Sequence, residues 1–405
     1  MKNIILSNAT EYNGNLGCVA LCYSVLFLID ELFSENGESY HLYLTDSNTR
    51  QRENEVSILG RTIRYKTVTN PMPVSLKEVI KKILFLPETL RGMNVFRKAD
   101  NIMDIGQGDS FSDIYGMVRF NKIDFIHQTA RKFGKPYCLL PQTIGPFKSK
   151  EASRLASESL RKAAVVMARD ARSCQYVRES VKEQKRVDEY IDVAFLLPYQ
   201  KQAFDKGFLH VGLNVSALLW NGGYTGNNQF SLKDDYQKVV REIVAFFLKK
   251  DDVVVHLIPH VISESYSVED DSRVCAQLVS EFQSERLVKS PDFRSPIDAK
   301  SYISGMDFFL GARMHSTIAA FSAGVPVVPM AYSRKFNGLY IETLGYPTIA
   351  DLQKDDVKEI LQVVETAFDS RMQLREDIRK AITDKVEGRI LRLKNDLAAF
   401  LHLKR

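Results

Sequence analysis

The stretch Asp307–Met330 reads D-F-F-L-G-A-R-M-H-S-T-I-A-A-F-S-A-G-V-P-V-V-P-M, and it decides the fold class. Its apolar runs predict buried strands at Phe308–Leu310 and Val325–Val328, and the residues between them, His315–Ala323, follow a helical pattern. Glycines end the first strand and the helix. A strand, a helix and a second strand in this order are typical of a parallel sheet covered by helices.

Four polar residues follow the first of these strands, just before the helix and in its first turn: Arg313, His315, Ser316 and Thr317. The first-turn N–H groups of a helix lack intrahelical partners, and the helix dipole is positive there, so this position attracts an anion. An ordinary strand–helix turn with polar surface residues is the alternative. The arginine and the histidine that flank one residue at the start of the helix favour an anion site.

Length and composition are those of a globular protein with more than one domain. The 405 residues exceed what one core usually supports, so two domains of roughly 200 residues are expected. The hydrophobic content of 45% and the charged content of 26% are ordinary. The net charge of +5 is too mild to suggest a nucleic-acid partner, but it suits small acidic ligands or an anionic membrane surface.

The sequence predicts a cytoplasmic location, compatible with association at the inner face of the membrane. Met1–Ser7 lacks the length and the cleavage site of a signal peptide, and the longest apolar run, Cys18–Ile29, is too short to span a bilayer. The five scattered cysteines include no C-x-x-C pair, which indicates buried thiols and neither disulfides nor zinc. Because no histidine or carboxylate pair has metal-ligand spacing, no metal is expected.

Strand-like and helix-like segments alternate along the chain, with a polar break at Pro198–Gly207. The alternation predicts two Rossmann-like parallel-sheet domains that face each other across a cleft, with ligands bound beyond the carboxyl ends of the strands. We expect a first domain at residues 1–200 and a second at 208–383. The amphipathic pattern at 384–405 predicts a C-terminal helix that packs back on the first domain.

Apolar runs and helical periodicities divide the chain further. The predicted strands are Asn3–Ser7, Tyr40–Thr45, Thr62–Val68, Asn101–Ile105, Tyr137–Pro141, Val165–Ala168, Glu189–Val193, His210–Asn214 and Val253–Ile258, besides the two named above. The predicted helices are Leu16–Phe33, Leu76–Leu84, Lys122–Phe133, Lys150–Lys162, Ala171–Val181, Leu232–Leu248 and Asp270–Phe282.

Two glycine-containing turns follow predicted strands of the first domain. Gly14–Cys18 opens a helix, so its backbone N–H groups could cradle a ligand, and a structural tight turn is the alternative. Gly106–Ser110 begins like a dinucleotide motif, but Phe111 replaces the third glycine and Asp109 would repel a phosphate. A nicotinamide cofactor is therefore not expected, and close approach of backbones explains these glycines.

Other polar side chains at strand ends are expected to line the cleft. Gln142 follows one strand of the first domain, and Arg169 ends the next, ahead of Asp170, which can cap the following helix. His260 ends a strand of the second domain, where a ligand contact and a polar strand terminus both stay open. Arg169 and Arg313 on facing domains would make the cleft cationic from both sides.

These segments together resemble the polysaccharide pyruvyl transferase family over residues 1–345. The most specific match is Gly311–His315 followed by Gly324–Pro326. Many relatives carry an acidic residue where this chain has Cys18, which puts a polar role at that position in doubt. The other matches are Asn15-x-Gly17 with Ala20-Leu21, Asp104–Asp109, Pro141–Pro146, Ala168–Asp170 with Ser173, Ile258–His260, and Tyr332 with Lys335.

The resemblance implies a GT-B-like fold and the transfer of a pyruvyl group from phosphoenolpyruvate to a sugar, forming a cyclic ketal. The sugar would belong to a surface-polysaccharide precursor, such as that of a capsule or an exopolysaccharide. The implied partners are phosphoenolpyruvate and a lipid-linked or polymeric glycan acceptor, with no cofactor beyond this donor substrate. The oligomeric state stays open.

Site roles follow from the chemistry of this donor. Phosphoenolpyruvate carries a phosphate and a carboxylate, both of which arginine recognises with planar bidentate contacts. We expect Arg313, Arg169 and Lys335 to hold the donor in the second domain, and His315 to act as the catalytic acid or base. The acceptor is expected to enter from the first domain. Further substrate contacts are expected from Asn15, Gly17, Gln142, His260 and Ser316.

Two other functions stay open. A nucleotide-sugar-dependent glycosyltransferase on the same fold would need an acidic residue to hold the ribose, and the sequence after Pro326 offers none that can be placed there. A non-catalytic partner in polysaccharide assembly would have no need of Arg313, His315 and Arg169 together.

Overall fold

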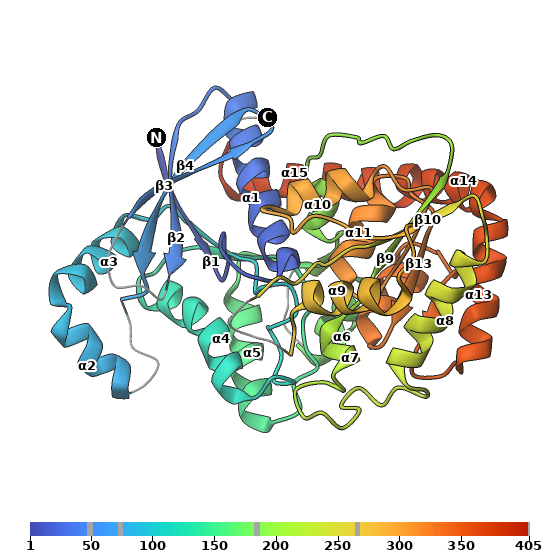
Figure 1. Cartoon of the computed structure of the whole chain (residues 1–405). Coiled ribbons are helices and arrows are strands. Elements are labelled where there is room, and N and C mark those ends of the chain that lie inside the picture. Colours follow the sequence, from blue (N-terminus) through green and yellow to red (C-terminus); the bar gives the residue numbers. More distant parts are fainter. Residues whose placement is uncertain (47–51, 72–75, 182–186, 264–267, 404–405) are drawn as a thin grey trace. The chain divides into compact units, whose positions relative to one another are not determined.

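The computed structural model describes residues 1–46, 52–71, 76–181, 187–263 and 268–403 (Figure 1). The chain forms two compact units. The first comprises Met1–Glu11, Leu21–Leu196 and Gly388–Arg405, and the second comprises Tyr12–Ala20 and Leu197–Glu387. These ranges differ from the predicted ones because Tyr12–Ala20 belongs to the second unit, although it follows the first strand of the first.

An eight-stranded sheet forms the core of the first unit, in the order β3-β4-β2-β1-β5-β6-β7-β8. All neighbouring strands are parallel except β3 and β4. The strands are β1 Lys2–Ser7, β2 Tyr40–Asp46, β3 Glu53–Ile58, β4 Arg61–Thr69, β5 Asn101–Asp104, β6 Tyr137–Gln142, β7 Val165–Ala168 and β8 Val187–Glu189.

Two strands of this sheet differ from the sequence prediction by more than one residue at an end. β3 was missed because it is an antiparallel edge strand whose side chains alternate between exposed and half-buried, with only Ile58 buried. The strand predicted at Glu189–Val193 lies earlier in the chain, at Val187–Glu189, where Val187 pairs with Val166 of β7. The residues after it form a short 3-10 turn, Val193–Leu196.

Helices flank this sheet, and all of them except α2 bury side chains against the rest of the unit, which stabilises them. They are α2 Leu76–Leu84, α3 Leu86–Lys98, α4 Met117–Lys132, α5 Lys150–Lys162, α6 Ala171–Ser180 and α15 Gly388–Phe400. Asp170 caps α6 by accepting a hydrogen bond from the Ser173 backbone N–H (2.8 Å). The C-terminal helix α15 is part of the first unit, where Asp396 accepts a hydrogen bond from Tyr190 (2.7 Å).

The helix α1, Leu16–Glu35, is shared by both units. Its residues up to Ala20 belong to the second unit, and those from Leu21 belong to the first. It is longer than the apolar run seen in the sequence. By length and composition alone it could cross a membrane, but most of its apolar residues are buried within the protein, as in the core helix of a globular domain.

A six-stranded, fully parallel sheet forms the core of the second unit, in the order β11-β10-β9-β12-β13-β14. The strands are β9 Leu209–Asn214, β10 Val253–Leu257, β11 Leu287–Lys289, β12 Phe308–Gly311, β13 Val327–Ala331 and β14 Ala350–Asp351. The helices are α7 Ala217–Trp220, α8 Tyr236–Leu248, α9 Asp271–Phe282, α10 Pro296–Ile303, α11 Met314–Ser322, α12 Arg334–Phe336, α13 Val357–Asp369 and α14 Arg371–Ala381, with π-helical turns at Asn337–Thr343 and Ile382–Glu387.

The predicted strand–helix–strand unit of the second domain is confirmed, with small shifts. The helix begins at Met314, and the strand after it begins at Val327 and not at Val325, because the Val325 N–H still bonds the Ala320 carbonyl of the helix end (3.0 Å). β9 lies at the centre of the sheet, between β10 and β12. The parallel register therefore brings the carboxyl ends of these three strands to one edge.

Candidate active site

Asn214, the last residue of β9, ties the loops at this edge together. Its side chain is fully buried. The amide oxygen accepts a hydrogen bond from the Arg313 backbone N–H (2.8 Å), and the amide nitrogen donates to the Ile258 carbonyl (2.9 Å). The loop before α11 and the loop after β10 are thereby held next to each other.

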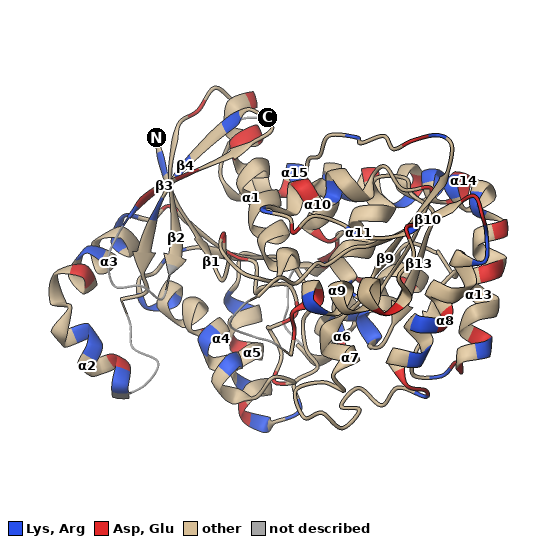
Figure 2. Cartoon of the chain, viewed as in Figure 1, with Lys and Arg blue, Asp and Glu red and all other residues tan. Residues whose placement is uncertain are grey.

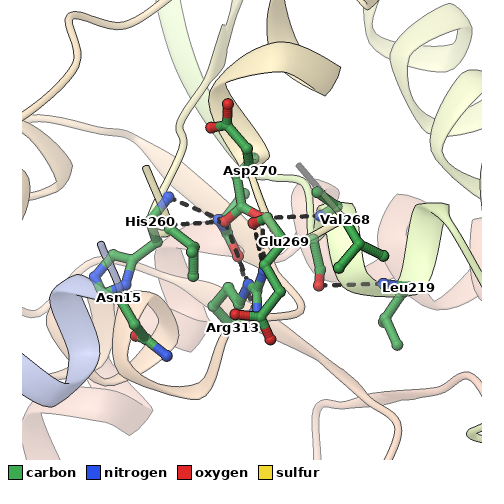
Figure 3. Close-up of polar contacts among 12 residues, drawn as sticks. Asn15, Leu219, His260, Val268, Glu269, Asp270 and Arg313 are labelled. Atoms are coloured by element: carbon green, nitrogen blue, oxygen red, sulfur yellow. Dashed lines mark hydrogen bonds and ion pairs between the residues drawn. The ribbon is translucent and has the colours of Figure 1, made fainter. Parts of the chain in front are cut away.

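Arg313 is the N-cap residue of α11, but its guanidinium turns towards the start of α9 (Figure 3). Nη2 and Nε reach the two carboxylate oxygens of Asp271 (2.8 and 3.3 Å), and Nη2 also donates to the Glu269 carbonyl (3.1 Å). Burial alone would lower the pKa of Arg313, but the Asp271 carboxylate outweighs it and raises that pKa. The sequence predicted that Arg313 holds an anionic donor, and the structure adds that its guanidinium is buried and ion-paired with Asp271.

Asp271 is the centre of this arrangement. Its carboxylate is fully buried and also accepts hydrogen bonds from the backbone N–H groups of Ala217 (2.8 Å), His260 (3.2 Å) and Val261 (2.9 Å). Sequence analysis missed this residue. The signal was the acidic run Glu269–Asp271 at the start of a predicted helix, which is typical of capping and hid its longer-range role.

His260 lies beside Arg313, and its imidazole is buried. Burial lowers the pKa of His260 to about 3, and the nearby guanidinium of Arg313 acts in the same direction. The ring is therefore neutral at physiological pH. It can donate or accept a hydrogen bond at a ligand, but it cannot supply a positive charge.

The segment before α1 forms the other wall of this site. Asn15 bridges to Val261, the Leu16 N–H donates to the His260 carbonyl (3.1 Å), and the Asn15 side-chain oxygen accepts from the Gly17 N–H (3.0 Å). A side chain is excluded at Gly17, because a Cβ there would lie 2.4 Å from Nδ1 of His315. The turn thus has a structural function, and it brings Asn15, Gly17, His260 and His315 together.

Residues after β13 complete the group. Lys335 is half-buried, with its ammonium 5.7 Å from the centre of the Tyr332 ring. Within the described part of the chain, the side-chain oxygens of Ser333 and Asn337, two residues to either side of Lys335, are buried and have no hydrogen-bond partner. Buried polar atoms are normally paired, so these two oxygens mark a place where a ligand could bind.

Ser316 was predicted to contact the substrate, but its hydroxyl bonds the backbone of its own helix. Its hydroxyl is fully buried and donates to the Arg313 carbonyl one turn earlier (2.7 Å). The neighbouring Thr317 hydroxyl donates to the Met314 carbonyl in the same way (2.8 Å). Both side chains stabilise the first turn of α11, so we do not retain Ser316 among the ligand candidates.

Arg169 and Gln142 belong to the first unit, and their contacts lie within it. The Arg169 guanidinium is buried, with Nη1 paired to Asp192 (2.8 Å) and Nε donating to the Thr143 hydroxyl (2.8 Å). The predicted contribution of Arg169 to a cationic cleft is thus corrected, because Asp192 pairs with its charge inside the unit. Gln142 donates to the Asp104 carbonyl (2.9 Å), and its buried oxygen lies over Gly106, where a Cβ would be only 1.8 Å away.

Asp104, from another of the quoted motifs, also pairs with a side chain of the protein. His127 contacts the carboxylates of Asp104 (2.9 Å) and Asp124 (3.3 Å), and all three residues are buried. Burial lowers the pKa of His127, but the hydrogen bonds to the two carboxylates outweigh it and raise that pKa to about 9. Among the residues the structure describes, no group of three His, Cys, Asp or Glu side chains could hold a metal ion.

Comparison with known families decides the assignment. Residues 15–334 match the model of the family described as "Polysaccharide pyruvyl transferase". The chain belongs to the polysaccharide pyruvyl transferase family. The family assignment confirms the resemblance seen in the sequence, and it makes this chain a transferase of polysaccharide biosynthesis. The match includes Asn15, Gly17, His260, Arg313 and His315 and ends just before Lys335.

Among curated proteins, the chain is similar to the amylovoran biosynthesis protein AmsJ of Erwinia amylovora. The two are 21% identical over 317 residues, which cover 74% of this chain and 73% of AmsJ. Amylovoran biosynthesis is the process printed for that relative, and it accords with the polysaccharide role of the family.

Solved structures establish the fold class. The S. aureus MnaA–UDP structure has a TM-score of 0.61 at 12% identity, covering 100% of this chain and 98% of that one. The structure of Anabaena Alr3699/HepE with UDP has a TM-score of 0.56 at 11% identity, covering 99% and 100%. A putative UDP-N-acetylglucosamine 2-epimerase from Listeria monocytogenes gives 0.60 at 12%, covering 100% and 98%. The expected GT-B-like fold is therefore confirmed, and at these identities the likeness concerns the fold alone.

Proposed function

We propose that this protein transfers the pyruvyl group of phosphoenolpyruvate to two hydroxyls of a sugar in a surface-polysaccharide precursor, forming a cyclic ketal. One observation supports this most. In a chain that belongs to this family, Arg313 and His315 lie at the start of α11, with His260 close to both. We propose a lipid-linked or polymeric glycan as the acceptor, a cytoplasmic location, and no cofactor beyond the donor substrate.

The donor carries a phosphate and a carboxylate, and several groups of the second unit suit such a small anion. The first-turn N–H groups of α11 favour an anion. The Asp271 contacts use Nε and Nη2 of Arg313, so the Nη1 edge of the guanidinium is the part available to a ligand. The Lys335 ammonium and the Ser333 hydroxyl can supply further donors to phosphate or carboxylate oxygens.

The reaction requires two new C–O bonds and the loss of phosphate. A proton adds to the terminal enol carbon, which becomes a methyl group, and the two sugar hydroxyls attack the neighbouring carbon in turn. The carbon–oxygen bond to phosphate breaks, and the hydroxyls release two protons, one of which replaces the proton used at the enol carbon while the other leaves with phosphate. We assign the proton transfer to His315, since the neutral His260 beside it can orient a substrate oxygen by hydrogen bonding.

Donor binding tests this function directly. Phosphoenolpyruvate should raise the melting temperature of the wild-type protein, because a ligand that binds only the folded state stabilises it by mass action, whereas UDP and UDP-glucose should not. In Arg313→Ala the lost charged contact should weaken phosphoenolpyruvate binding by about 1.5–3 kcal/mol, roughly ten- to a hundredfold. Arg313→Lys should rescue only part of this affinity, because a single ammonium cannot both pair with Asp271 as Nε and Nη2 do and present a second N–H edge to the donor.

Each variant is compared with its own ligand-free melting curve, since the Arg313 substitutions also disturb the Asp271 ion pair. A shift with UDP-glucose and none with phosphoenolpyruvate would instead favour a nucleotide-sugar glycosyltransferase. Absence of a shift with every donor, in a folded protein, would favour a non-catalytic partner in polysaccharide assembly.

Gly17→Ala should lower turnover roughly a hundredfold, the cost of displacing a catalytic group by about 1 Å. The added methyl group would overlap the His315 ring and push it from its position. The measurement is phosphate released from phosphoenolpyruvate with a cell-envelope glycolipid extract as acceptor. Gly388→Ala is the matched control, because a Cβ there meets nothing within 4 Å. Equal turnover in the two variants would remove the link between this turn and catalysis.

A further inference from the structure

The helix α2 of the first unit presents its apolar face outward. Ile80, Ile83 and Leu84 lie on one side of the helix by their spacing, and they are 56%, 67% and 73% exposed. The opposite side faces the protein through Lys82, whose ammonium donates to the Asn70 carbonyl and to the Thr69 hydroxyl (3.3 Å). An amphipathic helix on a globular protein normally does the reverse.

The apolar surface continues into the next helix. Phe85, Leu86 and Leu90 are 38%, 52% and 54% exposed. Together with the three residues of α2 they form a surface that we call the apolar ridge. The ridge contains six of the seventeen large hydrophobic side chains that are exposed in the described residues, all within the eleven residues 80–90. Single exposed hydrophobic residues are normal, but a contiguous group marks an interaction site.

Contacts of α3 with the turn before it and with β4 hold the ridge in place. Thr89 is buried, and its hydroxyl bonds the carbonyl oxygens of Lys82 (3.1 Å) and Phe85 (3.0 Å), which fixes the turn between α2 and α3. Gly92 packs so closely on β4 that a Cβ would lie 2.6 Å from the Thr69 carbonyl, and Phe96 is fully buried. The outward direction of the ridge is therefore held by specific contacts.

Basic residues outnumber acidic ones along α2 and α3, which carry the ridge (Figure 2). Residues 76–98 contain six lysines and arginines and two glutamates, a net charge of +4, whereas the whole chain carries only +5. Apart from Lys82, the basic residues are exposed: Lys77, Lys81, Arg91, Arg97 and Lys98. A second copy of this surface would bring like charges together, which argues against self-association through the ridge.

From this geometry we propose that the ridge docks the protein on an anionic lipid surface. An outward apolar helix face flanked by lysines and arginines is the arrangement that binds at a membrane interface, with the aliphatic side chains among the acyl chains and the cations at acidic headgroups. The inference rests on this surface alone and is independent of the donor chemistry. Docking would hold the first unit, where we expect the acceptor, at the membrane that carries a lipid-linked glycan.

The test is flotation of the full-length protein with vesicles of phosphatidylcholine alone and of phosphatidylcholine and phosphatidylglycerol in equal amounts. The wild-type protein should float with the mixed vesicles, and added salt should weaken this binding. The Ile83→Glu/Leu84→Glu variant should partition at least about tenfold less, because two inserting side chains are lost. Lys77→Gln and Lys81→Gln should each lower binding to the mixed vesicles by about fivefold.

Met372→Glu/Leu391→Glu is the matched control, since these two side chains are also more than half exposed but lie outside the ridge. It should bind like the wild-type protein. Failure of the wild-type protein to bind mixed vesicles, or equal binding by the ridge variant with its circular dichroism unchanged, would overturn the proposal. So would loss of a dimer in the ridge variant by sedimentation equilibrium without any vesicle binding, because the ridge would then join two copies of this chain.

Discussion

His315→Ala is expected to lower turnover by about a hundred- to ten-thousand-fold, the usual contribution of a general acid or base. The imidazole stands in the first turn of α11, against Gly17 and beside the neutral ring of His260. A neutral imidazole with a pKa near 3 is a poor proton donor at physiological pH, so His260 should not replace it. Affinity for phosphoenolpyruvate should fall much less, since the proposed charged contacts come from Arg313 and Lys335.

Turnover and donor affinity have to be measured on the same preparations of His315→Ala and His315→Gln, because only their divergence separates catalysis from binding. His41→Ala, which removes an exposed histidine of β2, is the control for the substitution itself. Near-normal turnover in a folded His315→Ala variant would return this residue to a structural role.

Asp271→Asn is expected to destabilise the second unit by about 3–5 kcal/mol, the cost of removing one partner from a buried ion pair. The substitution keeps the size of the side chain but leaves the charge of Arg313 buried without its partner. It also replaces one carboxylate oxygen by an NH2 group, which cannot accept a hydrogen bond. Either the bond from the Ala217 N–H to Oδ1 is lost, or those from the His260 and Val261 N–H groups to Oδ2 are lost. Calorimetry should show the loss as a lower melting temperature for one of the unfolding transitions.

The neighbouring residue provides a close control for this prediction. Asp270 caps α9 by accepting a hydrogen bond from the Ser272 N–H (3.2 Å), and asparagine caps helices about as well as aspartate. Asp270→Asn should therefore cost less than about 1 kcal/mol. Equal losses in the two variants would show that capping, and not the ion pair with Arg313, dominates the role of Asp271.

Much of the fold could be predicted because its signals are local. The helices α2 and α5 have their predicted ends, and β7 has its predicted range, since apolar spacing and flanking turn residues depend only on neighbours in the chain. β3 and α3 were not predicted. β3 is an exposed antiparallel edge, and α3 carries a proline and a glycine with few buried side chains, so each depends on packing that periodicity does not report.

The candidate site was predicted in part. Sequence motifs identified Arg313, His315, His260, Asn15 and Gly17, which the structure gathers in the second unit. They did not show that Arg313 pairs with Asp271, 42 positions earlier, or that Arg169 pairs with Asp192. A cation at a strand end looks the same in a sequence whether its partner is a ligand or a buried carboxylate.

The sequence by itself determined the family, the two parallel sheets and the helix with its anion-attracting start, because motif residues and hydrophobic periodicity are properties of contiguous chain. Only the tertiary structure decided that Tyr12–Ala20 belongs to the second unit, where the missing side chain of Gly17 leaves room for the His315 ring. It also decided that the apolar side of α2 faces outward. Periodicity shows that a helix has two faces but not which of them the rest of the protein covers. That choice is made by long-range contacts, such as the hydrogen bond from Lys82 to Asn70.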